Sequence, residues 1–340
     1  MVTSGCKQTE KHEIIHEENV IQGDYFGQKP PGKKAELFAP GIMSTGLIEL
    51  NAVFFPDQKE VIFSVALVPL QSMEWRLVMM KQENGKWSKP EIAEFNKDYS
   101  GVDPFVTAEG NRIYFCSNRP LSGEGEPEDN FDIWYVDRTE SGWTEPVNPG
   151  PPINSDKHDF YPSLTEDGTI YFQSRREGGF GESDIYFSKP VDGKYLTAEI
   201  LPEPLNSKNS EGDVFIAPDE SYIIISAERE ENNIGMSDLW ISFREAAGEW
   251  SDIVNMGAGI NSKGGENCPI LSPCGKYLFF TSRRSVQKTD SSSVTYDKIQ
   301  KAWISPQNSP WFGDIYWVDA GVINDLRDSM LVNKKDTHEE

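Results

Sequence analysis

Acidic side chains recur at regular intervals along this 340-residue chain and are the residues most able to do chemistry. Arranged around one axis, they would form a ring of like charges that raises each member's pKa or attracts a cation. Ca²⁺ prefers such hard oxygen ligands, and glycoside hydrolysis needs two carboxylates at a suitable separation. The alternative is structural: each carboxylate caps a backbone turn or pairs with an arginine of the neighbouring repeat. The candidates for the ring are Glu49, Asp103, Asp159, Glu211 with Asp213, and Glu266.

His158 is the only histidine outside the two ends of the chain, and it stands next to Asp159. A histidine beside a carboxylate can act as an acid or a base near neutral pH. A single histidine in a loop is also a common surface or hydrogen-bonded residue, and one histidine is too few for a zinc site. The candidates for catalysis are therefore Glu49, Asp103, His158, Asp159 and Glu211, and the candidates for metal binding are Glu49, Asp103, Asp159, Glu211 and Glu266.

Two segments interrupt the repeat, residues 120–131 and residues 285–313. Loops on a rigid scaffold commonly carry a binding surface. The second segment contains tryptophan and phenylalanine, whose rings, if exposed, would suit a sugar or a protein partner. A loop without function is the alternative. The binding candidates are Asp213, Glu266, Tyr161, Trp303, Trp311 and Phe312.

Short strands are the elements that must position these residues. A phrase of apolar and aromatic residues ending in serine returns five times, at residues 61–64, 113–117, 170–174, 223–226 and 278–282. A turn rich in Pro, Asp or Gly precedes each phrase, and a second strand phrase such as Asp184-Ile185-Tyr186-Phe187 follows it. Each unit offers four short strands and no amphipathic helix, which predicts the blades of a β-propeller.

The pattern resembles the PD40 (WD40-like) repeats of TolB-type propellers over roughly residues 49–320. The Pro-Asp turn, the aromatic-x-Ser-x-Arg strand and the Asp-Ile-Tyr strand carry the resemblance jointly. The resemblance implies an all-β chain with a single propeller of four-stranded blades. Five units favour five blades, although six are usual in the family. Features shared by the blades, such as the Ser-x-Arg pairs and the Asp of Asp-Ile-Tyr, are expected to hold the fold through ion pairs and hydrogen bonds.

The last unit lacks its final strand, whereas the N-terminal segment 35–41 has no blade of its own. We expect this segment to complete the last blade, because closure removes exposed sheet edges. The predicted organisation is a disordered or lipoprotein-like tail over residues 1–22, a propeller over residues 23–327 and a disordered tail over residues 328–340.

The chain carries 55 acidic and 32 basic residues, a net charge of −23. This charge disfavours nucleic acid and anionic membranes as partners, and no apolar run is long enough for a transmembrane helix. The start Val2-Thr3-Ser4-Gly5-Cys6 resembles the end of a bacterial lipoprotein signal, with a chance cysteine as the alternative. It predicts a periplasmic or outer-membrane-associated protein with Cys6 as its lipid anchor. Cys268 and Cys274 are expected to lie too far apart along an extended segment to bridge.

The main functional hypothesis is a non-catalytic, monomeric binding or scaffold propeller of the bacterial cell envelope. Such a protein would recognise a protein or a glycan through one face and its loops, and the sequence has no serine-nucleophile motif that argues for catalysis. The alternative is a carbohydrate-active enzyme, a glycosidase or a lyase, that uses the carboxylates at the channel mouth. A metal-dependent lactonase or esterase is a third hypothesis, and Ca²⁺ is the one cofactor that the carboxylates indicate.

Overall fold

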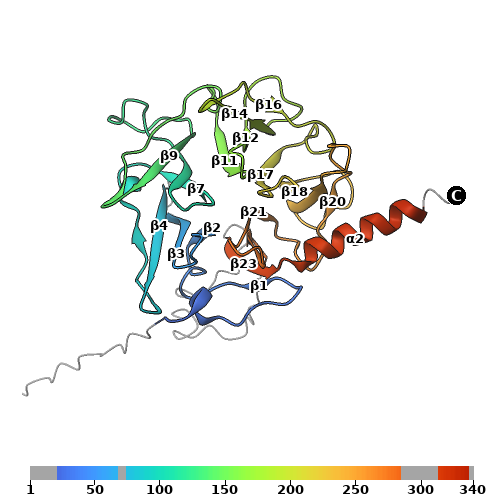
Figure 1. The fold of residues 1–340 in the computed structure, drawn as a ribbon, viewed down its shortest axis with the longest axis horizontal. Coiled ribbons are helices and arrows are strands. Elements are labelled where there is room, and N and C mark those ends of the chain that lie inside the picture. Colours follow the sequence, from blue (N-terminus) through green and yellow to red (C-terminus); the bar gives the residue numbers. More distant parts are fainter. Residues whose placement is uncertain (1–20, 68–73, 285–312, 337–340) are drawn as a thin grey trace, which may run out of the picture.

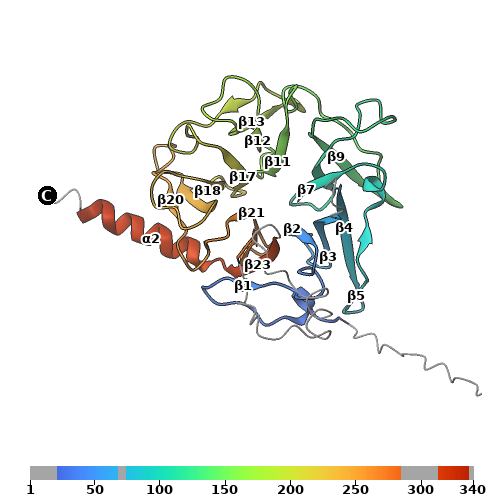
Figure 2. The ribbon, with the colours of Figure 1, turned by 180° about the vertical axis from the view of Figure 1, so that it is seen from behind.

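The computed structural model describes residues 21–67, 74–284 and 313–336. Five sheets surround a central channel and form a β-propeller of five blades (Figure 1; Figure 2 shows it from behind). Each blade starts with a strand beside the channel and continues outward through antiparallel partners. The predicted fold class and the favoured count of five blades are therefore confirmed. Within the described ranges no helix is long and apolar enough to cross a membrane.

The blades follow one another in chain order. Blade 1 holds β2 (Ile48–Phe54), β3 (Glu60–Leu67), β4 (Glu74–Glu83), β5 (Lys86–Trp87) and β6 (Glu91–Ile92). Blade 2 holds β7 (Gly101–Val106), β8 (Arg112–Ser117), β9 (Asp132–Thr139) and β10 (Gly142–Trp143). Blade 3 holds β11 (Asp159–Leu164), β12 (Ile170–Ser174), β13 (Asp184–Ser188) and β16 (Glu199–Ile200), with a side hairpin of β14 (Pro190–Val191) and β15 (Lys194–Tyr195). Blade 4 holds β17 (Glu211–Ile216), β18 (Tyr222–Ala227), β19 (Asp238–Phe243) and β20 (Val254–Asn255). Blade 5 holds β21 (Glu266–Leu271), β22 (Tyr277–Ser282), β23 (Asp314–Asp319) and β1 (Glu36–Leu37).

The N-terminal strand closes the propeller, as predicted. β1 pairs antiparallel with β23, with Leu37 opposite Tyr316, and Figure 1 shows the blue and red ends of the chain meeting there. The Ile315 N–H donates to Ser44 Oγ at 3.1 Å, and the Phe38 N–H donates to the Ile315 carbonyl at 2.8 Å. These bonds join the first and last parts of the chain in one sheet, so the last blade has no missing strand.

An asparagine in each linker ties one blade to the next. Asn154 Oδ1 accepts from the Ile133 N–H at 2.8 Å, and its Nδ2 donates to the Ile133 carbonyl at 2.9 Å. Asn206 and Asn261 make the same paired contacts with Ile185 and Leu239. The side-chain amide thus satisfies backbone groups that would otherwise be unpaired in the interior. The asparagine segments at residues 153–155, 205–207 and 260–262 are therefore structural linkers.

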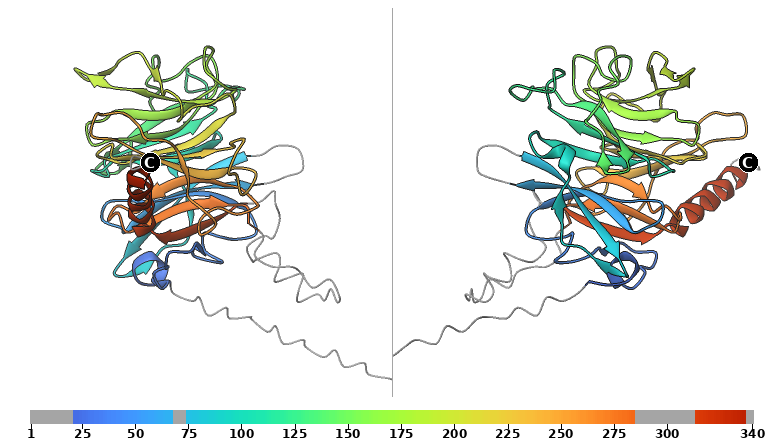
Figure 3. Two further views of the ribbon diagram at one scale, coloured as in Figure 1. Left: turned by 90° about the vertical axis from the view of Figure 1, so that its right-hand side faces the viewer. Right: turned by 60° about the vertical axis from the view of Figure 1, so that its left-hand side comes forward.

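The chain ends in a helix, α2 (Gly321–Asp336), that extends sideways from the propeller (Figure 3). Ile323 is buried, and Val322, Leu326 and Met330 pack against the main core. The four-residue spacing of these last three places them on one helical face. The prediction of a disordered tail from residue 328 was therefore wrong as far as Asp336, because this spacing was overlooked. The other predicted boundaries stay predictions.

Candidate active site in the central channel

The predicted carboxylates occupy two different positions on the innermost strands, so they do not form one ring. Each innermost strand contains a register shift, and the five shifts align the strands with one another. Glu49, Asp159, Glu211 and Glu266 are first in this alignment, whereas Asp103 and Asp213 are third. Intervals of about fifty residues could not reveal this two-residue offset, because loops of unequal length separate the blades.

The carboxylates at the first position hold the blades together. Asp159 Oδ2 accepts from the Ser155 N–H at 2.6 Å and from Ser155 Oγ at 2.9 Å, and Asp159 Oδ1 lies 3.0 Å from Arg176. Serines four residues upstream cap Glu211 and Glu266 in the same way, and Arg229 and Arg284 pair with these two carboxylates. These are the contacts of the structural alternative, except that each arginine belongs to the same blade and not to its neighbour.

The arginines of the Ser-x-Arg phrase extend this network into the linkers. Arg176 Nε donates to Ser174 Oγ at 2.8 Å, and its Nη2 donates to the Ile153 carbonyl at 2.6 Å. The guanidinium lies between the rings of Phe172 and Tyr186. Arg284 likewise joins a carboxylate, a hydroxyl and a linker carbonyl, and Arg229 joins a carboxylate and a linker carbonyl. This is the structural role expected for a residue repeated in most blades.

The third positions of the five innermost strands surround the channel, and we call them the channel ring. Tyr161 Oη donates to the Pro269 carbonyl at 3.0 Å, so this side chain reaches from blade 3 to blade 5. The Cys268 N–H and Sγ donate to Asp213 Oδ2 at 2.8 and 3.2 Å. Within the described ranges no hydrogen bond reaches the Asp103 carboxyl group. The ring consists of Asn51, Asp103, Tyr161, Asp213 and Cys268, and four of these are buried.

Asp103 and Asp213 have environments that separate their affinities for a proton. Burial raises the pKa of Asp103 well above its usual value, and the negative charge of Asp213 raises it further. Burial also raises the pKa of Asp213, but the two Cys268 donors and the positive charge of Arg283 lower it. These environments favour the protonated form of Asp103 and the ionised form of Asp213. Two carboxyl groups with opposed protonation states are the arrangement that acid–base chemistry requires.

A small polar pocket leads to Asp213 at the end of the channel where the innermost strands begin, which we call the N-mouth. Its volume is about 200 Å³. Arg283 is part of the wall, and Gly212, Gly264 and Gly265 leave room beside the half-buried Asp213. The remaining polar wall is formed by Gln173, Ser226, Ser237, Glu266 and Asn267. Hydroxyl and amide groups of this kind can exchange hydrogen bonds with a polyhydroxylated ligand.

His158 is held by its neighbours and makes no described contact with Asp103 or Asp213. Its Nδ1 accepts from the Phe131 N–H at 3.2 Å, and its ring stacks on Phe160 with centroids 5.4 Å apart. Burial and the charge of Arg175 lower the pKa of His158. These are the contacts of a hydrogen-bonded loop residue, which was the alternative to a catalytic role.

The remaining predictions fall into two groups. Among the described residues, no group of three or more His, Cys, Asp or Glu could hold a metal ion, because the first-position carboxylates are engaged within separate blades. The predicted binding of Ca²⁺ therefore gains no support there and stays a prediction. Trp303, Trp311, Phe312 and Cys6 lie outside the described residues, so their predicted roles and the predicted cellular location stay predictions. Cys116, Cys268 and Cys274 are free thiols.

Sequence reasoning missed Asn51 and Cys268 as channel residues and did not assign Arg283 to the site. A signal was present, since prolines follow three members of the ring, at Pro104, Pro162 and Pro269. Proline is tolerated in a strand that has an unpaired edge, and the innermost strand of a blade has one facing the channel. Alignment on these prolines would have separated the third position from the first.

No family model matches the chain, and no curated protein does. Solved structures do resemble it. A glycoside hydrolase shares 11% identity, with 86% of this chain and 92% of that chain covered at a TM-score of 0.50. The catalytic domain of a GH62 α-L-arabinofuranosidase from Coprinopsis cinerea shares 10% identity, with coverages of 85% and 98% and a TM-score of 0.48. The periplasmic gluconolactonase of Pseudomonas aeruginosa shares 12% identity, with coverages of 68% and 64% and a TM-score of 0.41.

These likenesses bear on the functional hypotheses. At such low identities they establish the fold and no activity. The similarity at a TM-score of 0.50 is to a glycoside hydrolase, so the main prediction, a non-catalytic scaffold of the cell envelope, was wrong, and the carbohydrate-active alternative is the one taken forward as a proposal. The PD40/TolB resemblance gains no support beyond the propeller itself. The chain is a five-bladed β-propeller with the buried Asp103 and the half-buried Asp213 at equivalent positions of two innermost strands.

Proposed function

We propose that this protein is a carbohydrate-active enzyme, a glycosidase, and that Asp103 and Asp213 are its catalytic pair. The observation that carries the proposal is that two carboxyl groups stand at equivalent positions of β7 and β17 in different environments, since two Cys268 donors contact Asp213 and no described hydrogen bond reaches the Asp103 carboxyl group. Glycoside hydrolysis uses two carboxyl groups in this way, one as an acid and one as a base or nucleophile. Glycoside hydrolases share the propeller fold, which makes the proposal compatible with the architecture without carrying it.

Each carboxyl group has a defined task in the proposed reaction. Asp103 holds the proton and donates it to the glycosidic oxygen as the bond to the sugar carbon breaks, so the leaving group departs neutral. Asp213 is ionised, and it supports the positive charge that develops on the sugar ring by attacking the anomeric carbon or by deprotonating the attacking water. The Cys268 donors orient the Asp213 carboxylate at 2.8 and 3.2 Å, which keeps it in place for this step.

The size of the N-mouth pocket indicates which part of a glycan would enter. Its volume of about 200 Å³ is smaller than the roughly 300–1,000 Å³ of a typical small-molecule site. A pocket of this size suits one terminal sugar and not an internal stretch of a polysaccharide. We therefore propose an enzyme that acts on the ends or the side branches of a glycan.

Turnover of aryl glycosides and of plant and algal polysaccharides by the purified protein tests this function. Asp103→Asn and Asp213→Asn should each lower kcat by roughly 10²- to 10⁴-fold, the usual contribution of a positioned acid or base. With a dinitrophenyl leaving group, which needs no proton, Asp103→Asn should regain most of its activity whereas Asp213→Asn should not. Glu140→Gln, an exposed change in blade 2, is the matched control. Wild-type protein without turnover on any of these substrates, or full activity in both Asn variants, would contradict the proposal.

A further inference from the structure

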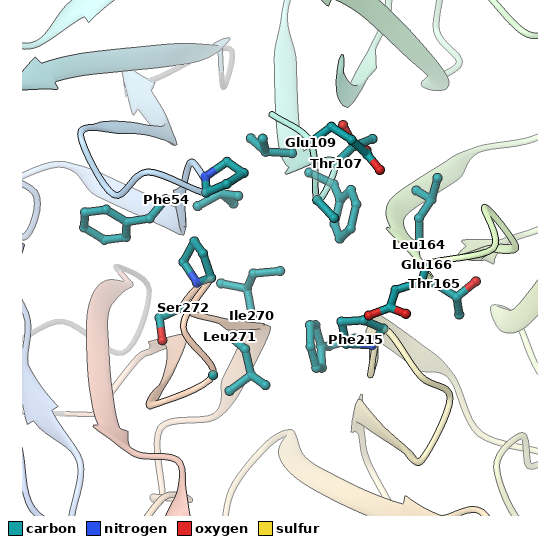
Figure 4. Close-up of a pocket in the computed structure, with 18 of the residues that line it drawn as sticks. Phe54, Thr107, Glu109, Leu164, Thr165, Glu166, Phe215, Ile270, Leu271 and Ser272 are labelled. Carbon is teal, nitrogen blue, oxygen red and sulfur yellow. The ribbon is translucent and has the colours of Figure 1, made fainter. Parts of the chain in front are cut away.

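A second cavity opens at the other end of the channel, where the innermost strands end, and we call it the C-mouth cup (Figure 4). Its volume is about 370 Å³, within the roughly 300–1,000 Å³ typical of ligand sites. All five blades contribute to it, through the last residues of the innermost strands and the turns that follow. None of its residues belongs to the channel ring or to the N-mouth pocket. Any ligand of the cup is therefore separate from the proposed substrate.

The wall of the cup is mainly apolar. Figure 4 shows Phe215 and Ile270 around the cavity, and Phe105 and Leu271 also line it. Phe105 and Leu271 are only partly buried, so apolar surface is exposed to water inside the cavity. Contiguous exposed apolar surface on a folded protein marks a place where another molecule binds. The cup is shaped to take an apolar group out of water.

Two carboxylates supply all of the formal charge in the wall. Glu109 follows β7 and Glu166 follows β11, on neighbouring blades, and both side chains are exposed. Figure 4 shows the Glu166 carboxylate beside Phe215 and Glu109 beside Thr107. In the part of the chain that the structure describes, neither carboxylate forms an ion pair with a lysine or an arginine. The cup therefore combines an apolar wall with two negative charges that lack a cation.

We propose that the C-mouth cup binds a small organic cation, an ammonium group carried on an apolar alkyl or aromatic body. The body would displace water from the phenylalanine and aliphatic wall, and the ammonium group would lie near Glu109 and Glu166. The net charge of −23 attracts cations towards the whole surface and repels anions. A phenylalanine ring in the wall adds an attractive face for the ammonium group.

Isothermal titration with three probes of similar shape and different charge tests the proposal. The probes are phenethylamine, 2-phenylethanol and 3-phenylpropionate. We expect phenethylamine to bind about tenfold more tightly than the alcohol, since two solvent-exposed ion pairs contribute up to about 1 kcal/mol each. The carboxylate probe should not bind. Equal affinity for the amine and the alcohol would overturn the cationic part of the proposal, and the absence of binding by both would overturn all of it.

Two variants assign the binding to the cup. Glu109→Gln with Glu166→Gln changes only exposed side chains, so folding is not at risk, and it should reduce the amine affinity to that of the alcohol. Val106→Trp places a large ring in the cup and should abolish binding of both probes, with retained circular dichroism as the check on folding. Glu140→Gln removes one negative charge elsewhere and should leave the affinities unchanged. An unchanged amine affinity in the Gln double variant, or amine binding that survives Val106→Trp, would refute the assignment.

Discussion

Blades 3, 4 and 5 carry a complete carboxylate–arginine pair beside the channel, whereas blades 1 and 2 each carry one half of it. In blade 3 the pair is Asp159 with Arg176, and blades 4 and 5 have the equivalents. Blade 1 keeps the carboxylate, Glu49, but the strand register places no arginine opposite it. Blade 2 keeps the arginine, Arg119, but has Gly101 where the carboxylate belongs. The comparison contrasts buried charges that have an ion-pair partner with buried charges that have none, within the same fold.

Burial shifts the pKa values of the isolated halves, and a partner alone does not restore ordinary values, because burial also raises the pKa of the paired Glu211 to about 7 and lowers that of Arg229. Burial raises the pKa of Glu49 to about 7 and lowers the pKa of Arg119 to about 10. Glu49 is capped by the Thr45 N–H and hydroxyl, and Arg119 Nη2 donates to the Phe95 carbonyl at 2.6 Å. These bonds solvate each charge in part without neutralising it. Glu49 in blade 1 and Arg119 in blade 2 thus form hydrogen bonds like those of the complete pairs, but neither has the oppositely charged partner.

Breaking a complete pair should give the largest effect. Arg176→Met leaves the fully buried Asp159 without its cation, and we expect the free energy of unfolding to fall by about 3–5 kcal/mol. Urea denaturation at pH 7 measures the loss. Arg175→Met, which changes the exposed neighbouring arginine, is the matched control and should cost under about 0.5 kcal/mol. Similar losses in the two variants would mean that the pair in blade 3 is not what stabilises this strand.

Removing the isolated carboxylate of blade 1 should change the pH dependence of stability. The pKa of Glu49 rises from an ordinary value of 4.5 to about 7 on folding, so the folded state holds its proton more tightly. The associated stability is complete below pH 4.5 and is lost as the pH rises through 7. Glu49→Gln should therefore flatten the stability profile over this window and stabilise the protein at pH 9 by up to about 3 kcal/mol.

The same substitution in a paired blade provides the contrast. Glu211→Gln leaves Arg229 with a linker carbonyl but no carboxylate, and we expect a loss of about 2 kcal/mol at pH 6. Thermal denaturation of both variants between pH 4 and pH 9 measures the difference. If Glu49→Gln and Glu211→Gln behaved alike, the distinction between complete and half networks would be incorrect.

Blade 2 has glycine at the first position because the linker leaves no room for a side chain. A Cβ atom at Gly101 would overlap with the buried Asn96 amide, which accepts from the Leu77 N–H at 2.7 Å. Gly101→Ala should therefore destabilise the protein by roughly 1–3 kcal/mol through overpacking. The cost should shrink in an Asn96→Ala background, because the two sites interact directly. Additive costs in a double-mutant cycle would rule out the clash.

The isolated arginine of blade 2 should give the smallest effect. Arg119→Met leaves no buried carboxylate behind, and the aliphatic replacement still packs against Phe115 and Trp134. We expect a loss of about 1 kcal/mol, mostly from the cation–π contacts. Parallel urea titrations compare this value with that of Arg176→Met. A cost as large as that of Arg176→Met would show that the arginine, and not the pair, carries the stability.

The sequence predicted a large part of the fold because each blade repeats the same local signals. The Pro-Asp turns, the Ser-x-Arg phrase and the unpaired segment at residues 35–41 were enough to predict five blades and their closure by an N-terminal strand. The helical tail was missed, although Val322, Leu326 and Met330 have helical spacing. The sequence identified the carboxylates as candidates, but the interval between repeats does not show which position of the innermost strand each carboxylate occupies.

The amino-acid sequence by itself determined the repeat, the blade architecture and the set of acidic residues near the channel, since these depend on local propensities and on pairing between neighbours in the chain. Only the tertiary structure decided which carboxylates form ion pairs and which two lie close enough for the charge of one to raise the pKa of the other. That distinction depends on the bulge in each innermost strand and on blades about 110 residues apart, Asp103 in blade 2 and Asp213 in blade 4. Burial and repulsion act over space, so the raised pKa of Asp103 is a property of the assembled channel and not of any single repeat.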